Sequence, residues 1–338
     1  MTPPPSDTAR AEPAEAPAAG GWPAALGTLA ARHGRQIGLP LACLTLVVFF
    51  GVTSDVFLNV QNFRNIGLAA AALAAVSFGQ TFVILTAGLD LSVGSTVALV
   101  SVVGGFAMRA YGIGAGIVAG LLTGIAVGVA NGLVITRLRV VPFIATLAML
   151  SIASGLALNL SAGVPVTGLP SAFGDLAYRR VVGIPVPVAI AFGMLILSDV
   201  VLRYTRRGRH LYAVGGNEEA ARLSGIEVDR VKLLAYMYCG ASAAVGSLIL
   251  TARVASGQPT LGVSLPLESV AAVVLGGVSL FGGRGSAVGV AFGVAFVSLL
   301  SNGLNLLNVS SYTQMMVIGA ALILAVALDQ ALARRGSG

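Results

Sequence analysis

The sequence has little charge. Of its 338 residues, 20 are Lys or Arg and 13 are Asp or Glu, so 10% are charged whereas 56% are hydrophobic. Soluble domains carry about 25% charged residues, and so few charges do not cover a water-exposed surface. The composition excludes a water-soluble enzyme. The 44 glycines follow no collagen repeat and accompany long apolar runs, so disorder is excluded as well. The chain is therefore predicted to be a polytopic membrane protein.

Cysteine and histidine are also scarce. Cys43 and Cys239 fall in apolar segments without a paired spacing, which is typical of small core residues. The only histidines, His33 and His210, lie outside the apolar segments, and no Cys, His and carboxylate cluster has metal-ligand spacing. The glycine-rich phosphate loop that ends in Gly-Lys-Ser/Thr is absent. We expect no intramembrane enzyme, no metal site and no ATP binding by this chain.

The uncharged windows between the charges predict an all-α bundle of ten transmembrane helices, because a helix needs about 20 apolar residues to cross a bilayer. The expected helices lie at residues 37–57, 66–87, 92–110, 112–136, 142–162, 184–203, 232–254, 266–282, 286–304 and 311–331. The eighth segment contains the fewest apolar residues between charges, and the sequence leaves open whether it fully crosses the membrane.

The basic residues support this count, because Lys and Arg are retained on the cytoplasmic side of a membrane. Ten spans with both termini cytoplasmic place 15 basic residues inside and 5 outside. Omitting the eighth span weakens this asymmetry to 12 against 8. The outer five are Arg64, Arg109, Arg179, Arg180 and Arg253. The net charge of +7 therefore reflects membrane orientation and not nucleic-acid binding.

The chain is predicted to comprise a tail and a membrane domain. Residues 1–36 contain five prolines by position 17 and mixed charges, which favour a disordered cytoplasmic tail. Residues 37–335 form the transmembrane domain, with a cytoplasmic loop at 204–231. The tail has no basic segment followed by an apolar stretch, so it is not a cleavable signal peptide.

Glycines indicate how the spans pack. Six of them recur every fourth residue from Gly112 to Gly132, and a shorter series runs from Gly285 to Gly293. Each four-residue step advances 40° beyond a full turn, so the first series forms a groove that winds slowly round its helix. Such grooves allow neighbouring backbones to approach closely. We expect both helices inside the bundle.

The polar residues within the spans are mostly neutral. Amides such as Gln80, Asn131, Asn302 and Asn305 suit a path for a hydroxyl-rich solute, and they equally suit hydrogen bonds between helices. The acidic residues Asp90, Asp199 and Glu268 are expected near span ends. The spans therefore lack the ionisable groups near the middle of the membrane that an ion-driven carrier usually needs.

The loop at 204–231 concentrates charge. Asn217 is a suitable N-cap, Glu218 and Glu219 favour a helix start, and Gly225 favours a helix end, which predicts a two-turn helix over 218–224. So short a helix is marginal alone. The local pattern leaves open whether it docks on a partner or is a solvated loop.

Six ordered motifs then resemble a known family. They are GLDLSVGS (88–95), PFIATL (142–147), GRHLYAVGGNEEAARLSGI (208–226), ASGQPTLG (255–262), AAVVLGGVSLFGGRGS (271–286) and NGLNLLNVSSYTQ (302–314). Together they are similar to the permease subunit of bacterial monosaccharide ABC importers, the ribose, xylose, arabinose and galactoside group. The resemblance covers about residues 60–330.

The resemblance implies a multi-pass subunit of the bacterial cytoplasmic membrane that works by alternating access. Its implied partners are a second permease, either an identical copy or a close paralogue, and a cytoplasmic ATPase that binds ATP and Mg²⁺. A periplasmic or lipid-anchored sugar-binding protein is also implied, and it sets which sugar is carried. The segment that implies coupling to the ATPase contains Gly215, Gly216, Asn217, Glu218, Glu219, Ala221, Arg222, Leu223 and Gly225. Asp90 and Arg284 are expected at a cytoplasmic gate, and turn formation and membrane anchoring are equally compatible with them. The alternatives are an ABC permease for branched-chain amino acids or nucleosides and an ion-coupled carrier.

Overall fold

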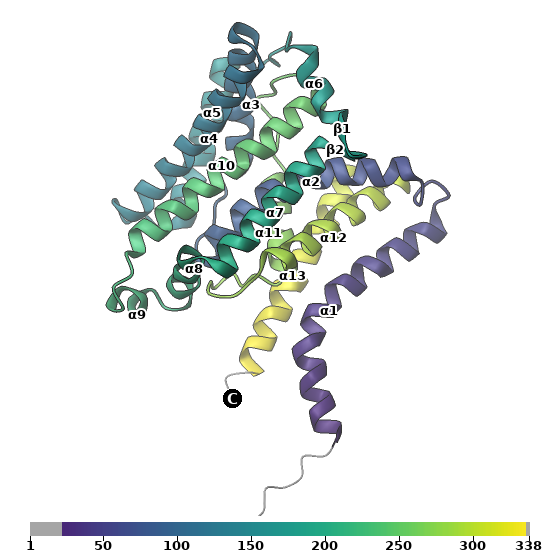
Figure 1. The fold of residues 1–338 in the computed structure, drawn as a ribbon, viewed down its shortest axis with the longest axis vertical. Coiled ribbons are helices and arrows are strands. Elements are labelled where there is room, and N and C mark those ends of the chain that lie inside the picture. The colour runs from purple at the N-terminus through teal and green to yellow at the C-terminus, as the bar shows by residue number, and fades with distance from the viewer. Residues whose placement is uncertain (1–21, 336–338) are drawn as a thin grey trace, which may run out of the picture. The chain divides into compact units, whose positions relative to one another are not determined.

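A computed structural model describes residues 22–335 (Figure 1). Within them lie thirteen helices and one two-stranded sheet: α1 (Trp22–Thr53), α2 (Val60–Leu85), α3 (Val93–Tyr111), α4 (Ile113–Thr136), α5 (Pro142–Ser161), α6 (Ser171–Tyr178), β1 (Arg180–Val181), β2 (Ile184–Pro185), α7 (Val186–Tyr204), α8 (Arg206–Gly216), α9 (Glu218–Leu223), α10 (Val228–Val254), α11 (Leu265–Leu275), α12 (Ala287–Leu306) and α13 (Ser311–Arg335). The all-α membrane class is confirmed.

The chain divides into two units, Met1–Gly38 and Leu39–Gly338. Most of the predicted tail, residues 1–21, lies outside the described residues. Helix α1 begins at Trp22, before the start at residue 37 that the charge pattern indicates. The descriptions below concern the second unit alone.

Seven helices are long and apolar enough to cross a membrane: α2, α3, α4, α5, α7, α10 and α12. Shorter apolar helices lie at Gly38–Thr53, Leu265–Leu275 and Ser311–Leu324. These helices occupy the positions of the ten predicted segments. The number of crossings and the side on which the termini lie remain predictions.

The eighth predicted segment is shorter than expected. Helix α11 has 11 residues, which is about 16 Å at the rise of an α-helix and well short of a hydrocarbon core of about 30 Å. It ends because Gly276 and Gly277 follow, and Gly277 adopts a positive φ of 84° that other residues rarely adopt. A helix over the whole of 266–282 is therefore wrong beyond Leu275.

Helix α2 is the centre of the bundle. In α2, 89% of the residues in the most apolar 18-residue stretch are buried, whereas the same share is 22% in α5 and 28% in both α4 and α7. Its side chains contribute to the largest hydrophobic cluster together with residues of α10, α11 and α12. Helices α4, α5 and α7 keep apolar outer faces, which is the pattern expected of helices that face lipid or another subunit.

The glycine groove of α4 packs as predicted. Near the start of the helix, Gly116 leaves no room for a Cβ beside Met108 of α3. Further along, Gly124 and Gly128 face the backbone of α10 at Gly240 and Tyr236. The groove thus changes its neighbour from α3 to α10 as it winds, and α4 and α10 lie side by side (Figure 1). In the second series, Gly289 and Gly293 admit the backbone of α11 in the same way.

Two small groups of elements mark the ends of this bundle. Helix α6 and the β1–β2 hairpin lie at one end, and α8 and α9 lie at the other (Figure 1). In the hairpin Arg180 pairs with Pro185 and Val181 with Ile184. Its two turn residues, Val182 and Gly183, both have positive φ, as a tight two-residue hairpin requires. The sequence analysis predicts no strand here.

Candidate functional site

The loop between α7 and α10 folds into two short helices with defined caps. Helix α8 starts where the Thr205 hydroxyl accepts a hydrogen bond from the Gly208 N–H at 3.1 Å. Helix α9 starts where Asn217 Oδ1 accepts one from the Ala220 N–H at 2.9 Å. It ends at Leu223, and Gly225 follows with φ of 81°. The predicted cap, helix and terminating glycine are all confirmed.

Ion pairs fix one side of α9. Glu218 accepts from Lys232 at 2.6 Å and pairs with Arg222 at 3.4 Å. Asp229 lies 3.6 Å from Arg222 and forms two hydrogen bonds, of 2.9 and 3.0 Å, with the guanidinium of Arg139. The network joins α9 to the start of α10 and to the turn between α4 and α5. Exposed pairs of this kind contribute only about 0–1 kcal/mol each, so they orient α9 more than they stabilise the fold.

The opposite side of α9 is free. Ala221 is buried against Val214 and Val228, whereas the side chain of Leu223 is 84% exposed. Glu219 is exposed and forms no ion pair within the described residues. An exposed leucine beside an unpaired carboxylate, on a rigidly held short helix, is a surface suited to contact with another protein.

The end of α8 touches two other turns through backbone alone. Gly215 lies against Leu85, the last residue of α2, and against Gly283 in the segment between α11 and α12. The Gly283 N–H donates to the Leu85 carbonyl at 3.0 Å. A side chain at position 215 would collide with this backbone, which explains the glycine. Gly216, in contrast, has open space around it.

Tyr212 adds a side-chain link to the same place. Its phenol donates to the Gly285 carbonyl at 2.9 Å. Partial burial raises the pKa of the Tyr212 phenol above its ordinary value, so the hydroxyl keeps the proton that it donates. Tyr212 and Gly215 therefore connect α8 to the end of α2 and to the segment before α12.

Asp90 is buried in the turn between α2 and α3. Its carboxylate accepts from the Ser92 N–H at 2.9 Å and from the Ser92 hydroxyl at 2.6 Å. Asn131 of α4 donates to Ser92 Oγ at 2.8 Å. The Asn131 amide also lies 3.5 Å from both carboxylate oxygens. Asp90 is therefore buried in the turn that follows α2, and its expected place at the inner end of the second span stays a prediction.

Arg284 and Asp90 do not form an ion pair with each other in the described residues. Arg284 is exposed, whereas Asp90 is buried. Arg284 lies next to Gly283 and Gly285, which both contact the α8 region. The two residues proposed for a gate thus belong to separate turns that share α8 as a neighbour.

The candidate pathway amides fall into two groups. Gln80 and Asn131 are fully buried between helices of one chain, and Gln80 Oε1 faces Cys239 Sγ at 3.6 Å. Asn302 exchanges two hydrogen bonds, of 2.9 and 3.0 Å, with Asn62 of α2. This amide therefore links two helices, which was the alternative to a place on the solute path. Asn305 is exposed. The four residues do not line one continuous surface.

Sequence reasoning missed several contacts that tertiary structure creates. Neither Ser92 nor Tyr236 was expected at a site, yet Tyr236 donates to the Leu89 carbonyl at 3.4 Å beside Asp90. The pair of Arg139 and Asp229 was also unforeseen. A polar residue flanked by apolar ones on α10 is the signal that would have pointed to Tyr236.

Residues 62–326 match the protein family described as branched-chain amino acid transport system / permease component. The chain belongs to this permease family. The match covers all of the helices from α3 to α12 and most of α2. It also identifies the chain as a transport subunit and not an enzyme, and as a multi-pass protein of the bacterial cytoplasmic membrane.

Several relatives of this permease have sugar import in their names. The ribose import permease protein of Bacillus subtilis (strain 168) is 45% identical over 88% of this chain and 93% of its own. The ribose import permease protein of Escherichia coli (strain K12) is 41% identical over 86% and 92%. The L-arabinose transport system permease protein of the same strain is 36% identical over 87% and 90%. No solved structure matches the chain.

Proposed function

We propose that this permease is the membrane subunit of an ATP-driven monosaccharide importer. The relatives described above are named for ribose and L-arabinose, and they align over nearly their whole length. This supports a pentose or a similar sugar over the branched-chain amino acids in the family description. An ion-coupled carrier is not favoured, because the relatives are import permeases and the Asp90 carboxylate accepts hydrogen bonds from the Ser92 N–H, from the Ser92 hydroxyl and, at 3.5 Å, from the Asn131 amide.

The proposed arrangement has ten crossings with both termini cytoplasmic. Two permease copies enclose a path between them, and an ATPase that carries ATP and Mg²⁺ binds below. A sugar-binding protein delivers the substrate to the end that carries α6 and the hairpin. The permease holds no cofactor. Residues 1–36 form a separate tail before a transmembrane domain over 37–335.

Helix α9 is the proposed coupling helix, and its geometry carries the proposal. Gly215, Gly216, Asn217, Glu218, Ala221, Arg222 and Gly225 shape and hold it. Glu219 and Leu223 face outward, where an ATPase groove would receive them. ATP-driven movement of α9 reaches the turns that carry Asp90 and Arg284 through Gly215 and Tyr212. The cytoplasmic gate would then open or close, giving alternating access.

Replacement of Leu223 tests this assignment. Leu223→Asp should abolish sugar-stimulated ATP hydrolysis and uptake in proteoliposomes that contain the permease, its ATPase and its binding protein, because an apolar contact at the centre of an interface commonly contributes 2 kcal/mol or more, roughly thirtyfold in affinity. Val182→Asp is the matched control, since Val182 is 96% exposed at the other end of the bundle. Glu219→Lys should weaken coupling as well.

Two results would contradict the proposal. Unchanged coupling in Leu223→Asp and Glu219→Lys together would remove α9 from the ATPase interface. Sugar uptake by the permease alone under a proton or sodium gradient would remove the ATPase from the mechanism. Ribose and arabinose are the first sugars to test in the same vesicles.

A further inference from the structure

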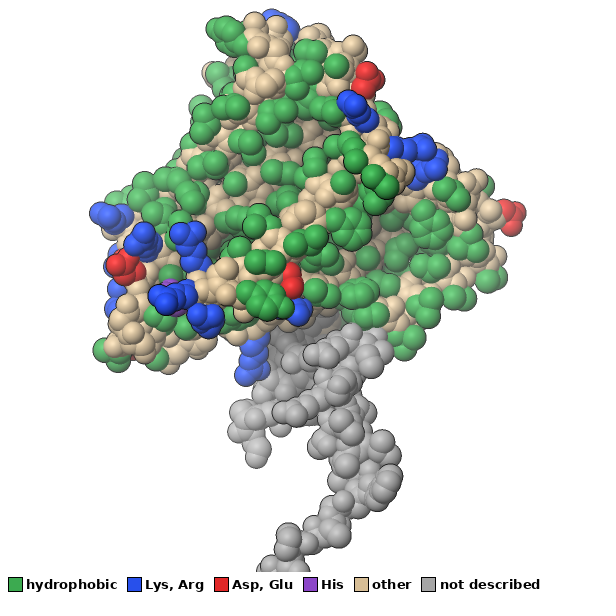
Figure 2. Space-filling model, in the orientation of Figure 1, with side chains coloured by type: hydrophobic (Ala, Val, Ile, Leu, Met, Phe, Trp, Pro, Cys, Tyr) green, Lys and Arg blue, Asp and Glu red, His purple; other side chains and the backbone are tan. Residues whose placement is uncertain are grey.

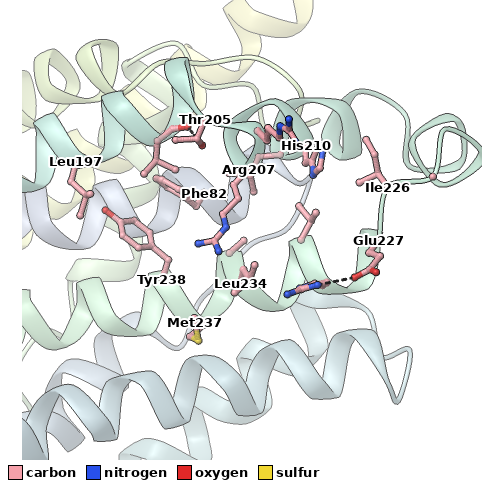
Figure 3. A pocket seen from close by; sticks show the side chains of 17 residues that line it. Phe82, Leu197, Thr205, Arg207, His210, Ile226, Glu227, Leu234, Met237 and Tyr238 are labelled. Carbon is pink, nitrogen blue, oxygen red and sulfur yellow. Dashed lines mark hydrogen bonds and ion pairs between the residues drawn. The ribbon is translucent and has the colours of Figure 1, made fainter.

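A cavity of about 850 Å³ lies between the end of α7, the start of α8 and the first turns of α10. Figure 3 shows its lining side chains and the open space between α8 and α10. The cavity shares Gly225 with the coupling segment, but neither Glu219 nor Leu223 nor Gly215 lines it. Its lining is apolar in the deep part and basic in the shallow part.

The deep part of the cavity is apolar. It is lined by Phe82 of α2, by Leu197 and Val201 of α7, and by Leu234 and Met237 of α10. Along α10 the lining runs from Val231 to Tyr238, seven residues or about 10 Å. Leu197 is also exposed on the outer face of α7 together with Ile196 and Val200. The cavity is therefore continuous with an exposed apolar surface of α7.

The shallow part is basic. Arg206, Arg207 and His210 of α8 and Arg230 of α10 line it, with Glu227 as the only acid. Glu227 pairs with Arg230 at 3.4 Å, whereas Arg206 and Arg207 form no ion pair within residues 22–335. Arg207 points from α8 into the cavity (Figure 3). Figure 2 shows Lys and Arg side chains gathered at this end of the bundle beside hydrophobic surface.

We propose that this cavity binds one anionic phospholipid of the cytoplasmic leaflet. Its phosphate lies against Arg206 and Arg207, and an acyl chain lies along Leu197, Leu234 and Met237. Basic pockets between transmembrane helices on the cytoplasmic side are established places for anionic headgroups. The occupant bridges the end of α7 and the start of α10, the two helices that carry the coupling loop, and so holds that loop at the membrane surface.

Both halves of the cavity are needed for this assignment. A zwitterionic lipid would suit Arg206 and Arg207 less well, because its headgroup brings its own cation beside the phosphate and adds no net negative charge to a basic site. A soluble phosphate compound would leave about 10 Å of apolar lining in contact with water. A lipid that carries a negative phosphate and a long acyl chain satisfies both.

Native mass spectrometry of the purified full-length permease in mild detergent tests the proposal. The probes are phosphatidylglycerol and phosphatidylcholine with identical acyl chains. The permease should retain phosphatidylglycerol in preference. Each basic residue strengthens binding to an anionic headgroup about fivefold, so R206Q/R207Q should weaken phosphatidylglycerol binding about 25-fold and leave phosphatidylcholine unchanged. R179Q/R180Q is the matched control, an adjacent arginine pair at the other end.

A second variant tests the apolar half without changing charge. Leu234→Trp fills the acyl part of the cavity and should lower phosphatidylglycerol binding, and an excess of glycerol 3-phosphate should not displace the lipid from the unaltered permease. Equal retention of both lipids, or equal effects of the two arginine pairs, would overturn the proposal. Displacement by glycerol 3-phosphate would make the cavity a soluble-anion site. Loss of ATPase binding with unchanged lipid binding in R206Q/R207Q would assign it to the ATPase.

Discussion

At the scale of single residues, the polar side chains inside the permease mostly connect its helices. Asn62 and Asn302 exchange two amide hydrogen bonds between α2 and α12. Ser101 and Thr251 share one of 2.7 Å between α3 and α10. Ser247 donates to the Val97 carbonyl at 2.6 Å. Inside a membrane each of these groups needs such a partner, because water is absent.

The amide pair gives a prediction at this scale. Asn302→Ala removes both hydrogen bonds and leaves the buried amide of Asn62 with only the Phe57 carbonyl, so the permease should lose about 0.5–1 kcal/mol of stability. The measurement is the unfolding midpoint in mixed micelles. Asn305→Ala is the control, because Asn305 is exposed and forms no side-chain hydrogen bond within residues 22–335.

The same variants separate the two interpretations of these amides. Sugar uptake by Asn302→Ala should follow the amount of folded permease. If uptake fell while stability stayed unchanged, Asn302 would line the path, and the interhelical interpretation would be wrong.

At the scale of elements, the sequence predicts local signals well and tertiary contacts poorly. The cap at Asn217, the stop at Gly225 and the four-residue glycine period depend on neighbours in sequence, so the pattern alone was enough. The eighth segment was predicted too long, because a count of charges does not register the break at Gly276 and Gly277. The burial of Asp90 involves Tyr236 and Asn131, which lie far from it in sequence.

The helix crossing of α4 and α10 makes a second prediction. Gly128→Leu places a side chain against the backbone of Tyr236 and Met237, so the two helices must separate, at a cost of about 1–3 kcal/mol. The amount of folded permease recovered in detergent and its melting temperature should both fall. Gly114→Leu is the control on the same helix, because nothing lies within 4 Å of a Cβ there. Equal loss in both variants would indicate an effect of helix propensity or expression, not of packing.

At the scale of the whole molecule, the distribution of charge predicts the orientation of the bundle in the membrane. The hairpin with Arg179 and Arg180 is expected outside, and α8 and α9, which contain four arginines, are expected in the cytoplasm. Whether the chain crosses the membrane nine or ten times depends on α11 and the segment between α11 and α12. Helix α11 alone is too short to cross the membrane. The segment after it nevertheless reaches the side that carries α8, because the Gly283 N–H donates to the Leu85 carbonyl and Gly283 lies beside Gly215.

Cysteine labelling checks this orientation. Cys43 is replaced by serine, and Cys239 stays because it is fully buried. A membrane-impermeant maleimide should label Val182→Cys in right-side-out vesicles, and Leu223→Cys and Phe281→Cys only in inverted vesicles. Phe281 is 66% exposed in the α11–α12 segment, so it reports on the crossing in question. Labelling of Phe281→Cys from outside would mean that α11 does not carry the chain across. The positive-inside balance of 15 to 5 would then drop to 12 to 8.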